Sequence, residues 1–479
     1  MEPGVSEPAA AAGWLDRDHW LQALWRLPVW GPLTGLLERL GGARLAPVPI
    51  PPLPAGRGPL DALAPAGPAG LRAGAAAIDI TPKHPEGVYL AGFASNRRCS
   101  AVRDPLYARA LVLSAGGPPL VIVALDLIGL SLGRGRRIRR LISRRWPERV
   151  LLVCTHNHQG PDTVGLWGRS LLDTLPLRSG LDEAVLAGIE RGVLQAIAGA
   201  LADMRPARLQ LAAGEFDRAG RWVRNDRAKL RDTRLRVLHL ADRRGATIAT
   251  LAQHACHPET LWHGNRRMSA DYCAVCCRTV ERALGGVGLY VNGALGAMVT
   301  ANLDQDAPSA LREAFVDELG RAVGRAAVRL LRRRGRPVDR PTVDVALAPV
   351  TLPAGDNRLY RLLHALGVVE QRDLSRGLET EVALARIGPA RLLGLPGEPS
   401  PALGLELLAR LDGQPRFLLG LCNDELGYLL PPEYYHDPRY AYEQMMTPGP
   451  QAALRLSLAV ESLADRIRAP VASGGRRAV

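Results

Sequence analysis

Four short segments, far apart in the sequence, carry side chains that can bind a metal ion, and each lies at or just beyond the end of an apolar run. The candidate ligands are His156, His257, Glu398 and Tyr428. Side chains at strand ends from distant parts of a chain can converge on one point. Two histidines, a glutamate and one further oxygen ligand form a donor set that suits Zn²⁺. The pattern therefore predicts a zinc site built from dispersed residues.

The first of these segments carries two histidines. His156 and His158 directly follow the apolar run 150–154, which predicts a buried strand. In an extended segment, residues i and i+2 face the same side. We therefore expect both imidazoles to point into one cavity at the end of this strand, a functional arrangement rather than one of core packing.

The second segment also offers two histidines, His254 and His257, after the predicted strand 247–253. Their spacing alone does not decide which one binds the metal. We favour His257, because it lies where the strand gives way to a turn at Pro258. Glu259 is close enough in sequence to act as a general base or to hold a ligand in place.

The third and fourth segments supply oxygen atoms. Glu398 ends an apolar run at 392–398, and the glycines there allow close approach of the backbone. The alternative for Glu398 is a purely structural charge at the start of the helix predicted from about 402. Tyr428, taken alone, would be assigned to the core.

Alternating strand and helix patterns begin at about residue 72 and surround these segments. Short runs rich in Val, Ile and Leu predict strands at 120–125, 150–154, 235–240, 247–253, 288–291, 343–347, 381–387, 392–395 and 417–421. Helical periodicity predicts helices at about 181–202, 270–284, 308–333, 402–411 and 450–468. Because several strands are apolar throughout, we expect them to be buried on both faces. The fold class predicted is α/β, with a mixed β-sheet layered with helices.

Two further segments precede the predicted main domain, which spans 71–470. Residues 1–44 hold half of the chain's eight tryptophans, and proline interrupts their helical spacing. This pattern predicts two short amphipathic helices that dock on the main domain or a second subunit, or that contact a membrane interface. Residues 45–70 are proline-rich and predict a semi-extended linker or a strap across the surface.

The composition limits the partners. The formal net charge is +14, but the arginines are scattered and aromatic residues make up only 5%, so we expect no nucleic-acid partner. The seven cysteines are odd in number and form no disulfide pattern, which favours a reducing compartment. Cys273 and Cys276 form a CxxC motif, for which helix packing is a better interpretation than redox chemistry. With neither a signal peptide nor a membrane span predicted, we expect a cytoplasmic protein, and peripheral contact with a membrane is the alternative.

Eight motifs resemble, in the same order, the catalytic domain of neutral, non-lysosomal ceramidases and the wider bacterial family of ceramidase-like proteins. They cover about residues 72 to 465, and lie at 77–82, 104–110, 125–126, 155–161, 256–258, 396–398, 423–428 and 442–443. The resemblance implies a ceramidase-catalytic-domain-like fold and one catalytic zinc ion, held by the residues named at the outset. It also implies that His158, Arg218 and Tyr442 line the substrate site.

The chain departs from the ceramidase pattern in two places. Ceramidases carry a Gly-Asp-x-Ser segment whose serine takes part in amide cleavage. In the matching stretch, 292–299, Ala297 stands for the aspartate and Val299 for the serine. Ceramidases also end in an immunoglobulin-like domain, and we expect no such C-terminal domain in this chain.

The sequence thus predicts a zinc-dependent hydrolase of an amide or ester bond that uses zinc-activated water on a small N-acyl or lipid-like substrate. His158 or Glu259 would move the proton, and Arg218 would stabilise an oxyanion. One alternative is a non-catalytic, zinc-containing binding protein, which the apolar residues at 297 and 299 favour. Another is a related transfer reaction in a biosynthetic pathway. The sequence does not decide the oligomeric state.

Overall fold

The structure is a computed structural model that describes residues 50–63, 70–171, 175–176, 178–353, 358–370 and 372–468. Its larger sheet is mixed, with parallel pairs at both ends and antiparallel pairs between them. The strand order is β13 (Val287–Asn292), β11 (Thr247–His254), β10 (Arg234–Asp242), β8 (Arg205–Glu215), β1 (Arg72–Asp79), β3 (Tyr107–Ser114), β4 (Leu120–Leu125) and β5 (Val150–Cys154), and β15 (Arg336–Val338) also pairs with β8.

The larger sheet consists of two halves that curve toward each other. β1 and β8 join the halves through only two residue pairs. At the far end, β13 contacts β3, β4 and β5. The side-chain amide of Asn292, at the end of β13, donates to the carbonyl of Thr155, just beyond β5, at 2.9 Å. This closure brings the C-terminal ends of β5 and β11 together, and both candidate histidine segments begin there.

A second, four-stranded mixed sheet packs against the first. It contains β16 (Val343–Leu352), β17 (Leu378–Ile387), β18 (Ala390–Gly394) and β20 (Arg416–Leu419). One apolar cluster joins side chains from both sheets, including Leu151 and Leu289 from the larger sheet and Leu392 and Phe417 from the smaller one. The sequence analysis predicted a mixed sheet layered with helices; the structure has two such sheets, face to face.

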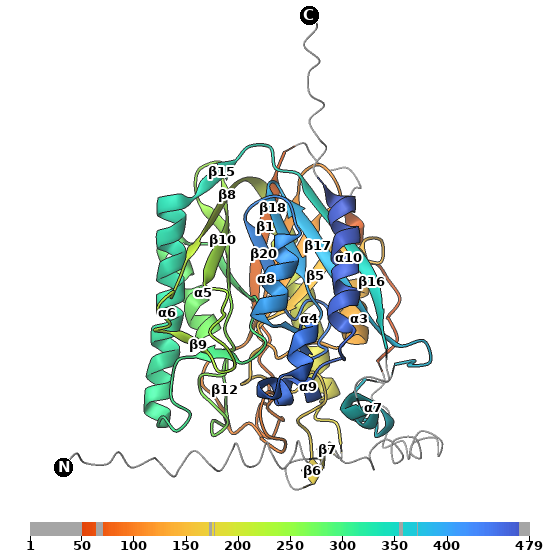
Figure 1. Cartoon of the computed structure of the whole chain (residues 1–479). Helices are drawn as coiled ribbons and strands as arrows, with labels where there is room; N and C mark the ends of the chain where they lie inside the picture. The colour runs from red at the N-terminus through yellow and green to blue at the C-terminus, as the bar shows by residue number, and fades with distance from the viewer. Residues whose placement is uncertain are drawn as a thin grey trace, which may run out of the picture.

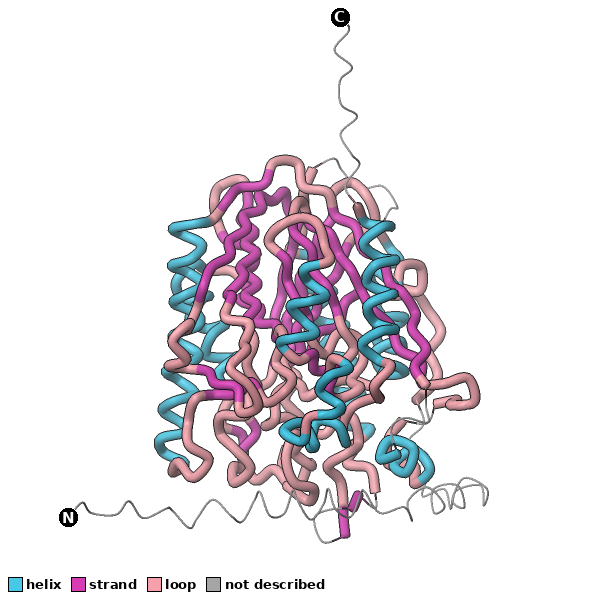
Figure 2. Tube along the Cα trace, viewed as in Figure 1, coloured by secondary structure: helices cyan, strands magenta, loops and turns pink. Residues whose placement is uncertain are grey.

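Helices cover both outer faces, which gives four layers (Figure 1). On the larger sheet lie α3 (Leu132–Ile142), α4 (Glu183–Ala202), α5 (Asp271–Leu284) and α6 (Ser309–Arg334), and on the smaller sheet lie α8 (Pro401–Ala409) and α10 (Ala452–Ile467). Figure 2 shows that loops gather at one end of these layers. The short helices α7 (Arg358–Ala365) and α9 (Ala441–Met445) lie at that same end.

Small two-stranded ladders tie the loops together at this end. They are formed by β2 (Ala101–Val102) with β12 (Arg267–Met268), β6 (Ser170–Leu171) with β7 (Leu175–Pro176), β9 (Val223–Asn225) with β14 (Val299–Ala301), and β19 (Glu398–Pro399) with β21 (Tyr428–Leu429). Short ladders supply hydrogen bonds to backbone that would otherwise be buried unpaired. They therefore give loop residues fixed positions.

All the predicted helices and strands are present, but β1, β3, β8 and α3 were missed. β1 is rich in alanine, and α3 contains five arginines, so neither shows a strong hydrophobic pattern. α3 packs Ile138 and Ile142 into the core, and its buried Arg134 and Arg139 form ion pairs with Glu183 and Glu381. Long-range ion pairs of this kind have no local sequence signal.

Two features of the sequence have a structural explanation. α4 is long and apolar enough to cross a membrane by length and composition alone, but it buries Leu186, Val193 and Ile197 against the core. All seven cysteines are free and buried. Burial raises the pKa of the Cys273 and Cys276 thiols well above the usual value, which disfavours thiol redox chemistry.

The described part of the proline-rich segment lies against α3. Arg137 donates to the carbonyls of Pro51 and Pro52 at 2.7 Å, and Leu60 is buried in the main core. Residues 50–63 therefore form a strap over α3. The amphipathic helices predicted for residues 1–44 lie outside the described residues.

Candidate active site and metal centre

His156 lies two residues beyond β5 in a left-handed backbone conformation, with φ of 66°. Its Nδ1–H group donates to the carbonyl oxygen of Ile128 at 2.9 Å. Its Nε2 atom faces Oε2 of Glu398 at 3.4 Å. A backbone carbonyl that holds one ring nitrogen leaves the other free to bind a metal, which is the usual support of a metal-binding histidine.

His257 repeats this arrangement from the other half of the sheet. Its Nδ1–H group donates to the carbonyl oxygen of Val299 at 2.9 Å, and its Nε2 atom lies 2.9 Å from Oε2 of Glu398. The sequence left a choice between His254 and His257. His254 remains within β11 as the register partner of Asn292, outside this group.

Glu398 and Tyr428 are register partners in the β19–β21 ladder, which is parallel. The ladder requires glycine beside it, because a Cβ atom on Gly397, whose φ is 152°, would lie 2.5 Å from the carbonyl oxygen of Gly427. Paired residues in a ladder project to the same side of it. Glu398 and Tyr428 therefore face one cavity, and both line it.

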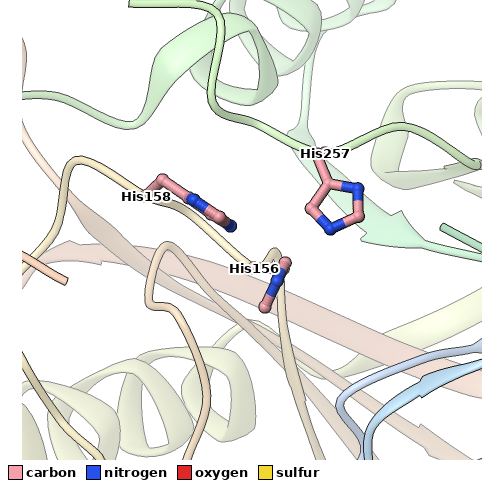
Figure 3. Close-up of side chains that lie close together, drawn as sticks. All are labelled: His156, His158 and His257. Carbon is pink, nitrogen blue, oxygen red and sulfur yellow. The ribbon is translucent and has the colours of Figure 1, made fainter. Parts of the chain in front are cut away.

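His158 completes a group of three buried histidines, shown in Figure 3. One nitrogen atom from each of His156, His158 and His257 lies within 4.8 Å of the others. The Nδ1 atom of His158 is 3.6 Å from Oε2 of Glu259, which is also buried. His158 thus lies between the metal-binding group and a second carboxylate.

Mutual charges set the protonation of this group. Burial raises the pKa of Glu398, but His156 and His257 outweigh it and lower the pKa to about 2. Burial lowers the pKa of His257, but Glu398 and Glu259 outweigh it and raise the pKa to about 9. Burial, together with the nearby His156 and His257, lowers the pKa of His158 well below 6.5. His158 is therefore neutral and able to accept a proton at neutral pH.

A cavity of about 110 Å³ opens beside these residues. His156, His158, Glu398 and Tyr428 line its polar end. Most of the remaining wall is apolar and comes from several loops and α7, with Ile128, Val164, Leu166, Trp167, Leu359, Leu363, Val369, Leu378, Leu426, Met445, Met446 and Pro448. A polar centre at the end of a long apolar wall fits a substrate with a hydrocarbon chain.

Known proteins show the same fold. A model of the N-terminal part of neutral/alkaline non-lysosomal ceramidases matches residues 71–318, more than half of the chain. The chain belongs to this ceramidase family. No curated protein matches the chain.

Two solved ceramidase structures are similar over most of the chain. Neutral ceramidase from Pseudomonas aeruginosa is 18% identical with a TM-score of 0.69, and the match covers 84% of this chain and 76% of that one. A structure described as ceramidase complexed with C2 is also 18% identical with a TM-score of 0.69, covering 83% and 75% of the two chains. The predicted ceramidase-like fold is thereby confirmed, and the family assignment identifies the chain as a hydrolase.

The other predicted site residues of this ceramidase-family chain fall into two groups. Tyr442 lines the cavity, with its ring centroid 6.0 Å from that of Tyr428. Arg218 does not reach the site: it is exposed in a turn, where Asp217 has a φ of 55° and the chain bends away. Its assignment to the substrate site is therefore corrected.

Arg227 is an arginine near the site that the sequence analysis did not single out. Its Nε–H group donates to Oε1 of the fully buried Glu443 at 2.7 Å, and Tyr428 is among its electrostatic neighbours. Sequence reasoning missed Arg227 because the chain contains many arginines. The only local signal is that Asn225 and Asp226 precede it as turn-forming residues.

The segment that departs from the ceramidase pattern, 292–299, contacts the site through the Val299 carbonyl and the Met298 side chain. The side chain of Val299 is buried in the apolar core against α5 and α6, and its carbonyl holds His257. Neither Ala297 nor Val299 lines the cavity. Met298 instead accepts a hydrogen bond on Sδ from the hydroxyl of Tyr428 at 3.5 Å, so it is the residue of this segment closest to the proposed ligands.

A polar patch on the cavity wall was also missed. It consists of Ser131, Glu370, Arg372 and Glu425. Burial and the charge of Glu398 raise the pKa of Glu425 well above its usual range. Ser131 is more than 200 positions from the other three, and Glu425 is more than 50 positions from Arg372, so no local motif could have revealed the patch.

Proposed function

We propose that this chain is a zinc-dependent hydrolase of the amide bond in an N-acyl, lipid-like substrate. The observation that carries the proposal is the shared geometry of His156 and His257. Each imidazole is fixed through Nδ1 to a backbone carbonyl, and each directs Nε2 at the same oxygen of Glu398. Structural requirements alone do not explain such convergence at the end of an apolar cavity.

The donor set fits zinc. His156, His257 and Glu398 would hold the ion, with Tyr428 as a fourth ligand on the same side of the ladder. A bound zinc ion would polarise the substrate carbonyl and activate a water molecule. The backbone contacts of both histidines fix the ring orientation before any ligand binds, which lowers the cost of forming the site.

His158 is placed to move the proton. It is neutral at neutral pH because burial and its neighbours lower its pKa. After accepting a proton from water it would be stabilised by Glu259, whose carboxylate lies 3.6 Å away. It would then deliver the proton to the leaving amine, as a general base followed by a general acid.

The cavity supports an acyl chain as part of the substrate. Burial of a hydrocarbon chain against the apolar wall contributes about 0.8 kcal/mol per CH₂ group. Tyr442 lines the cavity, with its ring centroid 6.0 Å from that of Tyr428, so it would contact the polar part of the substrate. The C2 complex of a related ceramidase is consistent with a small lipid-like ligand.

The decisive experiment combines metal analysis with activity. Purified protein should contain about one zinc per chain and release fatty acid from N-acyl amides of medium chain length. A chelator should abolish this release, and added zinc should restore it. Full activity in protein shown to be free of metal would overturn the zinc assignment, and metal-loaded protein inactive on every N-acyl amide and ester would overturn the hydrolase proposal.

A further inference from the structure

The polar patch on the cavity wall contains one carboxyl oxygen without a hydrogen-bond partner among the described residues. Glu370 is satisfied: Ser131 donates to it, the Gly133 amide donates at 3.1 Å, and Nε of Arg372 lies 3.3 Å away. Arg372 also binds Asp424, with Nη2 to Oδ1 at 2.8 Å. Two carboxylates thus already share the one guanidinium of this patch.

Glu425 is the exception. Its Oε1 atom accepts a hydrogen bond from the Gly427 amide at 2.8 Å, within its own loop. Its Oε2 atom is buried and has no hydrogen-bond partner among the described residues. No described arginine, lysine or histidine lies within ion-pair distance of it. A buried carboxyl oxygen without a partner is costly, so its retention beside a cavity indicates a ligand.

The position of Glu425 places that ligand near the reacting bond. The side chain lies against Gly129, where an added Cβ atom would come within 2.7 Å of it. The neighbouring Ile128 carbonyl holds His156. Glu425 is also an electrostatic neighbour of Glu398. The unpartnered carboxyl is therefore on the wall next to the metal centre, not at the far end of the cavity.

We propose that Glu425 binds a protonated amino group of the substrate, close to the amide that is cleaved. This inference rests on the proposed function, because the amino group belongs to the same N-acyl substrate. Glu370, Asp424 and Glu425 together offer three carboxyl groups against the single cation of Arg372. An ammonium group supplies both the missing charge and the missing hydrogen-bond donor.

Other ligands fit this wall less well. An anion would face the carboxyl groups of Glu370 and Glu425 on the cavity wall, and its oxygen atoms would offer no hydrogen-bond donor to Oε2 of Glu425. A hydroxyl group would supply a donor but would leave the charge of the patch unbalanced. The substrate class that follows is an N-acyl amide whose amine fragment carries a second, cationic amino group.

Binding of two ligands with the same chain tests the inference without any turnover. Octylamine is protonated at pH 7.5, and octan-1-ol is neutral. Isothermal titration calorimetry with the metal-loaded protein should show octylamine binding about tenfold more tightly, the effect of one charge-assisted hydrogen bond. In Glu425→Gln this preference should fall to about twofold or less, while octan-1-ol affinity stays unchanged.

The exposed Glu433 provides the matched control, and Glu433→Gln should keep the wild-type preference. Equal affinities in the wild-type protein, or a preference that survives in Glu425→Gln, would overturn the inference. If Glu425→Gln does not fold, the wild-type comparison still decides, because equal affinities contradict a cation site. The experiment measures binding and not amide hydrolysis. Its result can therefore be told apart from a failure of the proposed hydrolase function.

Discussion

Glu398 and Tyr428 are thirty residues apart, yet they pair directly in a two-stranded parallel ladder. The ladder fixes Tyr428 on the side of Glu398 that faces His156 and His257. The proposed metal centre thus depends on a few backbone hydrogen bonds, such as that from the Glu398 amide to the Gly427 carbonyl at 2.9 Å. Side chains held by rigid backbone need little reorganisation to bind a metal.

The histidines that face Glu398 should be required for metal binding. His156→Ala and His257→Ala should each reduce zinc from about one ion per chain to near zero, measured by mass spectrometry of the purified protein. His254→Ala is the control, because His254 is also a buried histidine near the end of β11 but faces away from the group. Retention of zinc in both site variants would show that the ligands lie elsewhere.

His158 should serve catalysis more than metal binding. His158→Ala should keep zinc, because the proposed site has four ligands without it, namely His156, His257, Glu398 and Tyr428. The variant should lose about 10²- to 10⁴-fold in kcat, the usual contribution of a general acid–base. Zinc content and kcat are measured on the same sample. Loss of zinc would make His158 a ligand instead.

Substitution of Arg227, which the structure places near the site, should have a larger effect than substitution of Arg218, which the sequence suggested. Arg227→Ala removes the ion pair of the fully buried Glu443 and should cost about 3 kcal/mol in the free energy of unfolding. It should also lower kcat/KM. Arg218→Ala, at an exposed position, should change neither quantity appreciably. Urea unfolding measures the free energy of unfolding, and steady-state kinetics measure kcat/KM. A larger effect on kcat/KM from Arg218→Ala than from Arg227→Ala would show that Arg218 belongs to the substrate site.

Restoring the residues typical of ceramidases should not restore their serine chemistry. Ala297→Asp combined with Val299→Ser should gain no amidase activity, because neither side chain lines the cavity. Val299 is completely buried, so the serine hydroxyl should lower the free energy of unfolding by about 1–3 kcal/mol. Urea unfolding and activity on an N-acyl amide check both parts. A gain in activity would show that the loop rearranges.

His254 should make the protein sensitive to acid. Burial, only partly opposed by Asp232, lowers its pKa from 6.5 to about 4. Because the folded-state pKa lies below the unfolded one, the stabilisation is complete above pH 6.5 and is lost as pH falls toward 4. The full effect is about 3 kcal/mol.

The comparison of wild type with His254→Gln isolates this contribution. Unfolding free energies measured by urea denaturation from pH 8 to pH 4 should fall less steeply in the variant. Other groups that titrate in this range are common to both proteins, so they cancel in the difference. Identical pH dependence would mean that His254 is not buried in its neutral form.

The local sequence was sufficient for the strands that lead into the site. The apolar runs at 150–154 and 247–253 correspond to β5 and β11, and the histidines that follow them are at the strand ends as predicted. The i, i+2 argument placed His156 and His158 together. Hydrophobic runs and histidine spacing are local properties, so predictions made from them do not depend on the tertiary contacts of the rest of the chain.

The position of Arg218 could not be predicted in the same way. In the sequence, Arg218 and Arg227 are two arginines among many, and both follow turn-forming residues. The structure separates them because the turn at Asp217 directs Arg218 into solvent, whereas Arg227 pairs with Glu443 from a segment more than 200 residues away. A contact of that kind has no signature in the sequence around either partner.

The sequence by itself determined which residues could form a metal centre, because ligand chemistry depends on side-chain type and on local position at strand ends. Only the tertiary structure decided which of them meet. His257 rather than His254 faces Glu398, because the two halves of the larger sheet curve together and the β19–β21 ladder places Glu398 between them. The acidic wall around Glu425 likewise exists only after folding, since buried charges from distant segments are brought together by the packing of two sheets.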